Sequence, residues 1–496
     1  MSQRPRRGSP ARRRAARRAD DRTRDARRSA PPGAKPRVRT LRLALAVAAG
    51  LLALLIVDLL LVPIDILTPH GAQVPLSPLY ALWAPAPATA GWGWSLPALV
   101  LATLVVVAAR RFLELGPANR QLVALATVVL LTSSFALTAG GPAALTAPFE
   151  IYAGEDYSAD LPLALAAPGA FLDHFAEIMP RLSLHGSTHP PGFTLLLATI
   201  VRLLGPSPLA RALTVILLGG LAVLPLHALA RRRHGEDAAG LALLLYATVP
   251  SVLLYTATSL DAILPLPAIV ALDALDRVRT GRLRWAAVGG LAIGVVTFLS
   301  FSGLALLGAG GLLLVLDRQG PRPWRRAAMA IALMLGGCVA PFAVLAVATG
   351  FDPIGCFAGA RANLAVLEEQ MKGRGQHPWR DWIYTTLGNT VAFAIGLGST
   401  VVAACLLAVR DIASRARRRT HDGLLVAALA TLVVMAVSGV YLLEVERIWL
   451  FLMPPLVAAA AGSLTREGAA RTALRPLVAI QIGQAVVLEL LLDTFW

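Results

Sequence analysis

Long apolar runs, separated by short connectors rich in arginine, dominate this sequence of 496 residues. A helix that crosses a bilayer needs about 20 apolar residues, and a backbone inside lipid must satisfy its own hydrogen bonds. A composition with 56% hydrophobic residues excludes an ordinary soluble protein. We interpret thirteen runs as membrane-spanning helices, beginning near Leu41, Trp92, Arg120, Leu209, Ala238, Ala262, Trp285, Ser302, Ala327, Leu387, Gly423, Arg447 and Pro476. The predicted fold is all-α, a polytopic integral membrane protein with about 13 transmembrane helices.

The first 40 residues form a basic tail, which precedes a transmembrane domain predicted over residues 41–496. The tail holds fifteen Arg or Lys and three Asp, and so supplies most of the formal charge of +17. It has almost no apolar residues beyond alanine, so we expect it to be disordered. No aromatic residues alternate with its arginines, which argues against nucleic acid as a partner. Its expected contact is anionic membrane lipid on the cytoplasmic side.

The charge of the connectors predicts the orientation of the chain, because short cytoplasmic loops accumulate Arg and Lys. Six connectors on the tail's side each carry at least two arginines, namely residues 110–120, 231–237, 277–284, 317–326, 410–422 and 466–475. The opposite face is poor in positive charge. We therefore expect a cell-membrane protein with a cytoplasmic amino terminus and an outer carboxyl terminus. The apolar segment 192–204 is too short to cross, and we interpret it as a re-entrant or interfacial helix.

Two long loops are predicted on the outer face, over residues 140–190 and 350–385, and the second is expected to contain a helix over residues 359–372. The first is acidic, with six carboxylates and three histidines but one arginine between residues 141 and 190. If Asp156 and Asp160 lie on a helix, their i, i+4 spacing places them on one face. One of them could then act as a general base, or both could bind a divalent cation such as Mg or Mn together with Glu155. A third interpretation is that they are solvated carboxylates on the loop surface.

We favour Asp160 as the base, because Leu161 and Pro162 follow it and should bring it toward the membrane, where its carboxylate is partly desolvated. Asp156 then orients the acceptor or binds the cation. The motif HGSTHPPGF follows this acidic stretch. Its two prolines predict extended backbone and then a helix start. His189, and with less weight His185, would bind a phosphate oxygen at the membrane surface, or His189 would only cap the helix.

A second group of ionisable residues lies between two predicted spans, in the sequence EVERIW. Arg447 there would contact phosphate, oriented by Glu444 or Glu446, or the three residues would form an internal salt bridge that fixes two helices. The same two interpretations apply to Asp261, at the outer end of another span.

The order of motifs over residues 188–277 resembles a known enzyme family. THPPGFTLLLATIVRLLG is followed by ARALTVILLGGLAVLPLHALARRRHG and then by AAGLALLLYATVPSVLLYTATSLDA. This order is similar to the dolichyl-phosphate-mannose protein mannosyltransferase type of the GT-C superfamily. The resemblance implies a GT-C-like fold, a polyprenyl-phosphate sugar donor, a catalytic carboxylate in the first outer loop, and carrier phosphate at His189. The chain departs from the family pattern in its two additional amino-terminal spans.

The residues and the resemblance together predict an inverting glycosyltransferase. It would move a sugar from a polyprenyl-phosphate donor to a glycan, lipid or protein acceptor on the outer face of the membrane, with an aspartate as general base. The alternative is a polytopic transporter or lipid-carrier flippase. Transport sites are usually built near the bilayer midplane from paired repeats, and the sequence has no such repeat.

Overall fold

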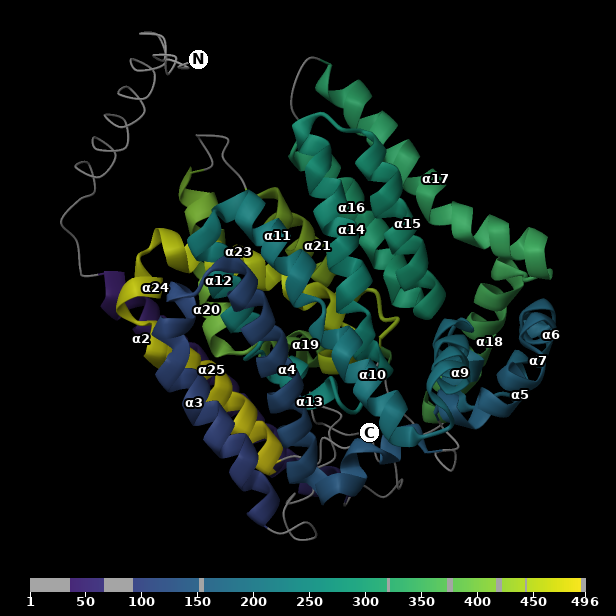
Figure 1. Cartoon of the computed structure of the whole chain (residues 1–496), viewed down its shortest axis with the longest axis horizontal. Coiled ribbons are helices and arrows are strands. Elements are labelled where there is room, and N and C mark those ends of the chain that lie inside the picture. Colours follow the sequence, from purple (N-terminus) through teal and green to yellow (C-terminus); the bar gives the residue numbers. More distant parts are fainter. Residues whose placement is uncertain are drawn as a thin grey trace, which may run out of the picture.

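The computed structural model describes residues 36–66, 92–150, 156–318, 322–372, 378–415, 422–441 and 444–491. Every regular element within these ranges is a helix (Figure 1). The predicted all-α class is therefore confirmed. The basic tail lies almost wholly outside the described residues.

The longer helices are α2 (Pro36–Ile66), α3 (Ser95–Glu114), α4 (Pro117–Gly140), α9 (Gly192–Leu204), α10 (Pro208–Gly220), α11 (Val223–His234), α12 (Glu236–Tyr246), α14 (Pro265–Arg277), α15 (Arg284–Leu299), α16 (Ala305–Leu316), α17 (Pro323–Thr349), α18 (Pro353–Lys372), α19 (Pro378–Leu397), α20 (Ser399–Arg415), α21 (Gly423–Val437), α23 (Met453–Arg466) and α25 (Leu474–Leu491). Short helices that matter for the site are η5 (Tyr157–Asp160), α5 (Leu161–Ala166), α6 (Pro168–Asp173), α7 (Phe175–Ile178), η6 (Met179–Arg181), α8 (Leu184–Thr188), α13 (Pro250–Tyr255), η7 (Leu260–Ile263) and α22 (Val445–Ile448).

Fewer helices are long enough to cross a membrane than the sequence predicted. Among the described residues, five qualify by length and composition, within α2, α3, α4, α10 with α11, and α17. The bent pair of α19 and α20 is a sixth candidate, and five further apolar helices are shorter. A helix lies close to each of the thirteen predicted starts, but thirteen spans are not confirmed. Proline and glycine divide several predicted spans, as at Pro250, where α13 begins after α12 has ended.

The short segment after the HPP motif has the bounds expected from the sequence, because α9 begins at Gly192 and ends at Leu204. The helix expected in the second outer loop is also present as α18, which begins earlier than predicted and ends at Lys372. The acidic loop folds into the short helices η5 to α8, and α18 packs against α7, η6 and α8.

The span predicted from Leu387 is divided into α19 and α20, which meet at an angle of 110°. Gly398 lies at the break with φ of +88°, a conformation that favours glycine. The side chain of Gln481 in α25 bridges the break, donating to Leu397 O at 2.8 Å and accepting from Thr400 N at 3.0 Å. Gln484 makes an equivalent pair of contacts with the same two helices. The polar backbone groups exposed by the break are thus satisfied inside an apolar bundle.

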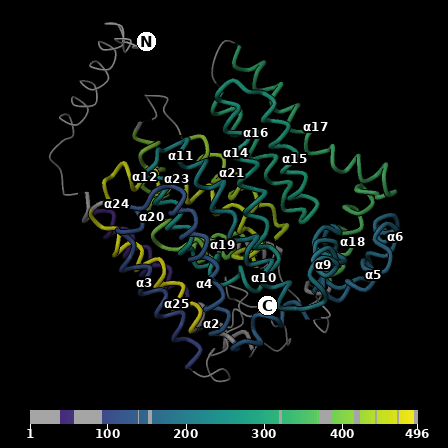
Figure 2. Tube along the Cα trace, viewed as in Figure 1, coloured from purple at the N-terminus to yellow at the C-terminus, as the bar shows by residue number. Residues whose placement is uncertain are grey.

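Segments from opposite ends of the chain lie side by side. Helix α25 packs against α3, and α2 packs against α20 (Figures 1 and 2). Helix α23 lies in the interior, buried from Met453 to Leu464, and contacts α11, α12 and α20. Helices α14 to α17 form a second group, in which a side chain at Gly290 would collide with the backbone of α17 at Met334. Small residues at such positions allow close helix packing.

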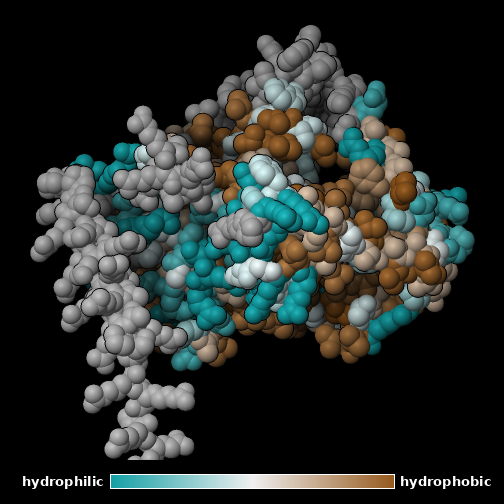
Figure 3. Space-filling model, turned by 90° about the horizontal axis from the view of Figure 1, so that it is seen from above, coloured by the Kyte–Doolittle hydropathy of each residue, from teal (hydrophilic) through white to brown (hydrophobic). Residues whose placement is uncertain are grey.

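Three of the arginine-rich connectors meet the end of α14 in one buried ion-pair network. Arg232 Nε lies 2.8 Å from Asp276 Oδ2, and Arg233 pairs with Asp276 at 2.9 Å, with Asp317, and with Asp422 at 3.4 Å. Segments that the charge rule assigns to one side of the membrane are therefore close together. Seen from the side that is uppermost in Figure 1, the surface carries a hydrophilic patch within apolar surroundings (Figure 3).

Candidate active site

The HPP motif joins α8 to α9 with extended backbone, as its two prolines predict. His189 follows the last residue of α8 with φ −126° and ψ 162°, and Pro191 is the N-cap of α9. The start of α9 is held against α15, because a side chain at Gly192 would collide with Phe298 O. This contact fixes His189 at the junction of the acidic loop and the helical bundle.

Asp160 holds the start of α8. Its Oδ1 accepts the main-chain N–H of Ser183 at 3.0 Å and its Oδ2 accepts the Ser183 hydroxyl at 2.7 Å. Ser183 in turn is the N-cap of α8 and accepts the N–H of Gly186 at 3.0 Å. Asp160 is only 5% exposed. Both carboxylate oxygens are engaged, so the geometry of Asp160 suits a structural contact and not the role of base that the sequence favours.

Asp156 points in a different direction. As the N-cap of η5 it accepts the N–H of Tyr157 at Oδ1, 2.7 Å away, and the same oxygen lies 3.8 Å from Nδ1 of His185. The side chain is 26% exposed. Asp156 and Asp160 therefore do not share one face, as they would if the segment were an α-helix. The segment between them is a 3₁₀ turn with three residues per turn, which separates positions i and i+4.

Tyr157 forms an aromatic cluster with the two histidines. Its ring stacks on His185 at 5.4 Å between centroids with an interplanar angle of 21°, and meets His189 edge-on at 6.0 Å. On its other side it contacts Phe193 of α9 at 5.3 Å. Burial, and secondly the charge of Asp261, raises the pKa of Tyr157, which keeps the phenol protonated.

His189 is neutral at pH 7 in this structure. Burial, followed by the nearby His185, lowers the pKa of His189 to about 4. Its Nδ1 lies 3.0 Å from the Thr188 hydroxyl and 3.2 Å from the carbonyl oxygen of His185. The carbonyl can only accept, and the Thr188 hydroxyl donates its hydrogen to Leu184 O at 2.9 Å, so we assign the hydrogen to Nδ1. Nε2 then has a lone pair and becomes a donor only when the ring is protonated.

Arg447 lies in a second cluster of charged residues. Its Nε is 3.6 Å from Asp261 Oδ2, one terminal nitrogen pairs with Glu444, and the other donates to the Ser259 hydroxyl at 3.4 Å. Ser259 also caps η7 by accepting the N–H of Asp261 at 3.1 Å. Glu444 has a φ of +64°, which is strained for a residue with a side chain. The fold thus holds Arg447 between two carboxylates.

Glu446, predicted as another partner of Arg447, contacts a tyrosine of α13. Its Oε1 accepts from the hydroxyl of Tyr255 in α13 at 3.5 Å, and the residue is 2% exposed. Glu444 and Asp261 contact Arg447, and Glu446 contacts α13.

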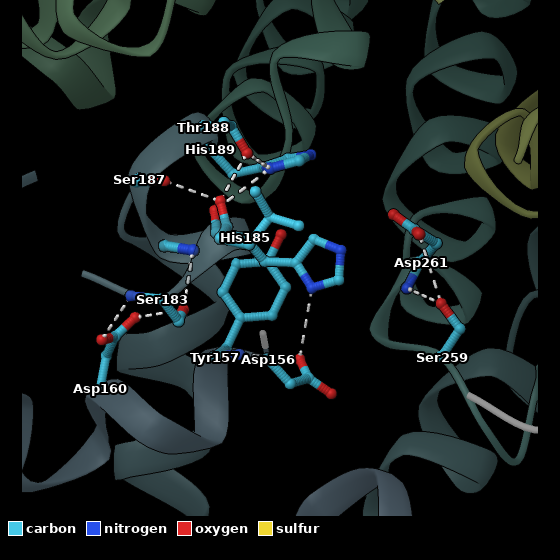
Figure 4. A network of polar contacts seen from close by, with 12 residues as sticks. Asp156, Tyr157, Asp160, Ser183, His185, Ser187, Thr188, His189, Ser259 and Asp261 are labelled. Atoms are coloured by element: carbon cyan, nitrogen blue, oxygen red, sulfur yellow. Dashed lines mark hydrogen bonds and ion pairs between the residues drawn. The ribbon is translucent and has the colours of Figure 1, made fainter. Parts of the chain in front are cut away.

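The two clusters face each other. Figure 4 shows Asp156, Tyr157 and the histidines on one side and Ser259 with Asp261 on the other, while Asp160 and Ser183 are turned away. The charges of Asp261 and Arg447 contribute to the lowered pKa of His189 in opposite directions, which reflects their proximity. The arrangement brings together a partly exposed carboxylate, an imidazole and an arginine from distant parts of the sequence.

Glu155 lies outside the described residues. Within them, no group of three or more His, Cys, Asp or Glu side chains is arranged to hold a metal ion. Of the cation ligands considered from the sequence, Asp160 is bound to Ser183 and faces away from Asp156.

Several residues of the site were missed by sequence reasoning. Tyr157 had a signal, since an aromatic residue directly follows an acidic pair in a polar loop. Ser183 and Ser259 had only the weak signal that serines cap helix starts. Asn363 of α18 donates to Ser187 O at 2.8 Å, and this long-range contact had no local signal.

Residues 188–346 match the family model described as dolichyl-phosphate-mannose-protein mannosyltransferase. No curated protein sequence shows significant similarity to the chain.

Among solved structures, ArnT from Cupriavidus metallidurans in the apo state is 19% identical, with 71% of this chain and 60% of that chain covered and a TM-score of 0.45. ArnT bound to undecaprenyl phosphate is 20% identical, with 62% and 59% covered and a TM-score of 0.40. The Archaeoglobus fulgidus oligosaccharyltransferase in complex with Zn and sulfate is 15% identical, with 66% and 49% covered and a TM-score of 0.36. The chain spans less than two thirds of the length of each.

The match over residues 188–346 begins at the HPP motif and includes α9 to α17 almost completely. It confirms the resemblance to the dolichyl-phosphate-mannose-protein mannosyltransferase family that the motifs predicted for this part of the chain.

Proposed function

We propose that this protein is an inverting glycosyltransferase, which moves a sugar from a polyprenyl-phosphate donor to an acceptor hydroxyl. The observation that carries the proposal is the position of Asp156, a partly exposed carboxylate beside His185 and across from Asp261, whose carboxylate lies 3.6 Å from Arg447 Nε (Figure 4). Glycosyl transfer needs a base for the hydroxyl and positive groups for the leaving phosphate, and these groups are of the required kinds. The family match supports the donor class.

Asp156 is the general base in this mechanism, in place of Asp160. Its Oδ2 has no hydrogen-bond partner among the described residues, whereas both oxygens of Asp160 are bound to Ser183. The Asp156 carboxylate takes the proton of the acceptor hydroxyl while the hydroxyl oxygen attacks the anomeric carbon. The bond between that carbon and the phosphate oxygen breaks, and the phosphate leaves with the electron pair. A single displacement inverts the configuration.

His189 and Arg447 stabilise the phosphate that leaves. The two side chains come from opposite sides of the site. Arg447 is 8% exposed and His189 is partly buried, and the scarcity of water strengthens charge-assisted hydrogen bonds. Arg447 is held in place by Asp261 and Glu444, so little side-chain entropy is lost when phosphate binds. His189 takes up a proton on binding and then donates from Nε2.

We place the site at the outer face of the membrane. The support is the ion-pair network around Arg233, which gathers arginine-rich connectors at the end of α14, whereas Asp261 of the candidate site precedes the start of that helix. Those connectors belong on the cytoplasmic side by the positive-inside rule. The donor would then lie in the outer leaflet, and the apolar ends of the helices would contact its prenyl chain.

The proposal is tested by incubating the purified full chain with a panel of radiolabelled polyprenyl-phosphate sugars and a mixture of glycan, lipid and peptide acceptors. The expected result is loss of label from one donor and its appearance in an acceptor, abolished in Asp156→Asn. A chelator arm tests whether a divalent cation is required. If a labelled carrier crosses vesicles containing the protein with its sugar bond intact, the protein is a flippase.

A further inference from the structure

Asp156 and His185 belong to a closed ring of contacts that includes the turn η5 and the helix α8. Along the chain, η5 runs from Tyr157 to Asp160, and Asp160 binds Ser183 through both of its oxygens. Ser183 begins α8, whose second residue is His185, and the imidazole returns to Asp156 with Nδ1 at 3.8 Å from Oδ1 (Figure 4). Two connections between the same two elements leave the imidazole little freedom to turn away from the carboxylate.

The plane of the His185 ring is also fixed. Tyr157 stacks on it at 21°, and Tyr157 itself is anchored against Phe193, which is fully buried. His189 meets the same ring edge-on at 5.9 Å. The ring therefore presents Nδ1 to Asp156 and directs Nε2 toward the side of the site where Asp261 lies (Figure 4).

We infer that His185 is a positioning residue for the base, an assignment that rests on the proposed function. When substrate binds, its Nδ1–H would donate to Asp156 Oδ1, which already accepts the Tyr157 N–H at 2.7 Å. With Oδ1 held by two donors, the carboxylate cannot rotate, and Oδ2 is the oxygen left for the acceptor hydroxyl. The present separation of 3.8 Å is longer than a hydrogen bond, and catalytic contacts of this kind shorten when substrate binds.

This role differs from the phosphate contact that the sequence suggested for His185. A phosphate contact would use Nε2, the nitrogen that faces away from Asp156. The positioning role uses Nδ1 alone. The two nitrogens can be distinguished by amide substitutions, because the amide N–H of asparagine occupies the place of Nδ1–H and that of glutamine the place of Nε2–H.

The test compares the full-length variants His185→Asn and His185→Gln with the wild type, using the donor that the wild type consumes. We expect His185→Asn to keep most of the wild-type kcat. His185→Gln should lose about 100-fold in kcat, as for a small misplacement of a reacting group, with the donor KM unchanged. Thermal unfolding of both variants checks that α8 is intact.

The opposite pattern would overturn the inference. If His185→Asn raises the KM for the sugar donor at unchanged kcat, while His185→Gln keeps the wild-type KM, His185 contacts the phosphate instead. Equal kcat in Asn and Gln would show that neither nitrogen positions the base. A wild type that consumes no donor in the panel would instead overturn the proposed function, and this assignment with it.

Discussion

The carboxylate of Asp160 accepts both the main-chain N–H and the hydroxyl of Ser183, at 3.0 and 2.7 Å. This contact joins two segments that are 23 residues apart and fixes the first turn of α8. It leaves Asp156 as the loop carboxylate that lies beside His185 and across from Asp261 (Figure 4). The proposal that Asp156 is the base and Asp160 a structural residue therefore depends on the position of Ser183.

Removing this contact should destabilise the acidic loop. Asp160→Ala leaves two buried donors of Ser183 without an acceptor, and we expect the free energy of unfolding to fall by about 1 to 3 kcal/mol. Gly186→Ala should have a similar effect, because its methyl group would collide with Asp160 Oδ2. Thermal unfolding in detergent measures both. Glu177→Ala is the matched control, since its side chain is 79% exposed, and it should leave the melting temperature unchanged.

Donor binding should be coupled to proton uptake at His189. The free ring has a pKa of about 4, and a bound phosphate raises the pKa, so the donor binds the protonated ring more tightly. The dissociation constant should be flat below pH 4, rise with pH by up to about tenfold per unit above it, and level off above the pKa of the complex. Titrations between pH 4 and 8 measure this dependence.

The control for His189 is His189→Asn. Its side-chain N–H can still form the hydrogen bond to His185 O, but the variant lacks Nε2. Its donor affinity should be weaker by roughly 1.5 to 3 kcal/mol at low pH and should lose the pH dependence. A wild type whose affinity does not change over this range would exclude His189 as a protonated phosphate ligand.

Arg447→Ala should affect both stability and donor use, because Asp261 and Glu444 lose their shared cation. Leaving buried carboxylates unpaired costs roughly 3 kcal/mol of folding free energy. Adding Asp261→Asn and Glu444→Gln removes those charges, and this triple variant should recover much of the stability but still use the donor poorly. If the triple variant also regains wild-type turnover at limiting donor, Arg447 is only a structural ion pair.

The orientation of the chain can be measured with reporters. A reporter fused after Trp496 should lie outside the cytoplasm, and one inserted within residues 410–422 should lie inside, next to the connectors that meet at Arg233. The reverse result at either position would mean that α9 crosses the membrane, which would invert every later connector.

Local sequence was sufficient to predict much of the fold. The paired prolines before Gly192 and the glycine after Leu204 set the bounds of α9, and apolar runs located the other helices. The division between α19 and α20 was not predictable in the same way. Gly398 permits the break, but Gln481 and Gln484, more than 80 residues further along the chain, satisfy the exposed backbone groups.

The candidate site shows the same limit. Residue types and spacing identified Asp156, His185, His189, Asp261 and Arg447, and these residues do come together. The choice between the two aspartates could not be made from the sequence. It depends on whether the segment is an α-helix or a 3₁₀ turn, and on a contact with Ser183 that only the folded loop creates.

The most direct test of the account is the turnover of Asp156→Asn and Asp160→Asn, measured side by side with the donor that the wild type consumes. Loss of a general base costs about 10² to 10⁴ in rate. We predict that Asp156→Asn loses this much, while Asp160→Asn, whose amide oxygen can still accept from Ser183 N–H, keeps most of its turnover and melts at a lower temperature. An inactive but stably folded Asp160→Asn beside an active Asp156→Asn would contradict the assignment of the base.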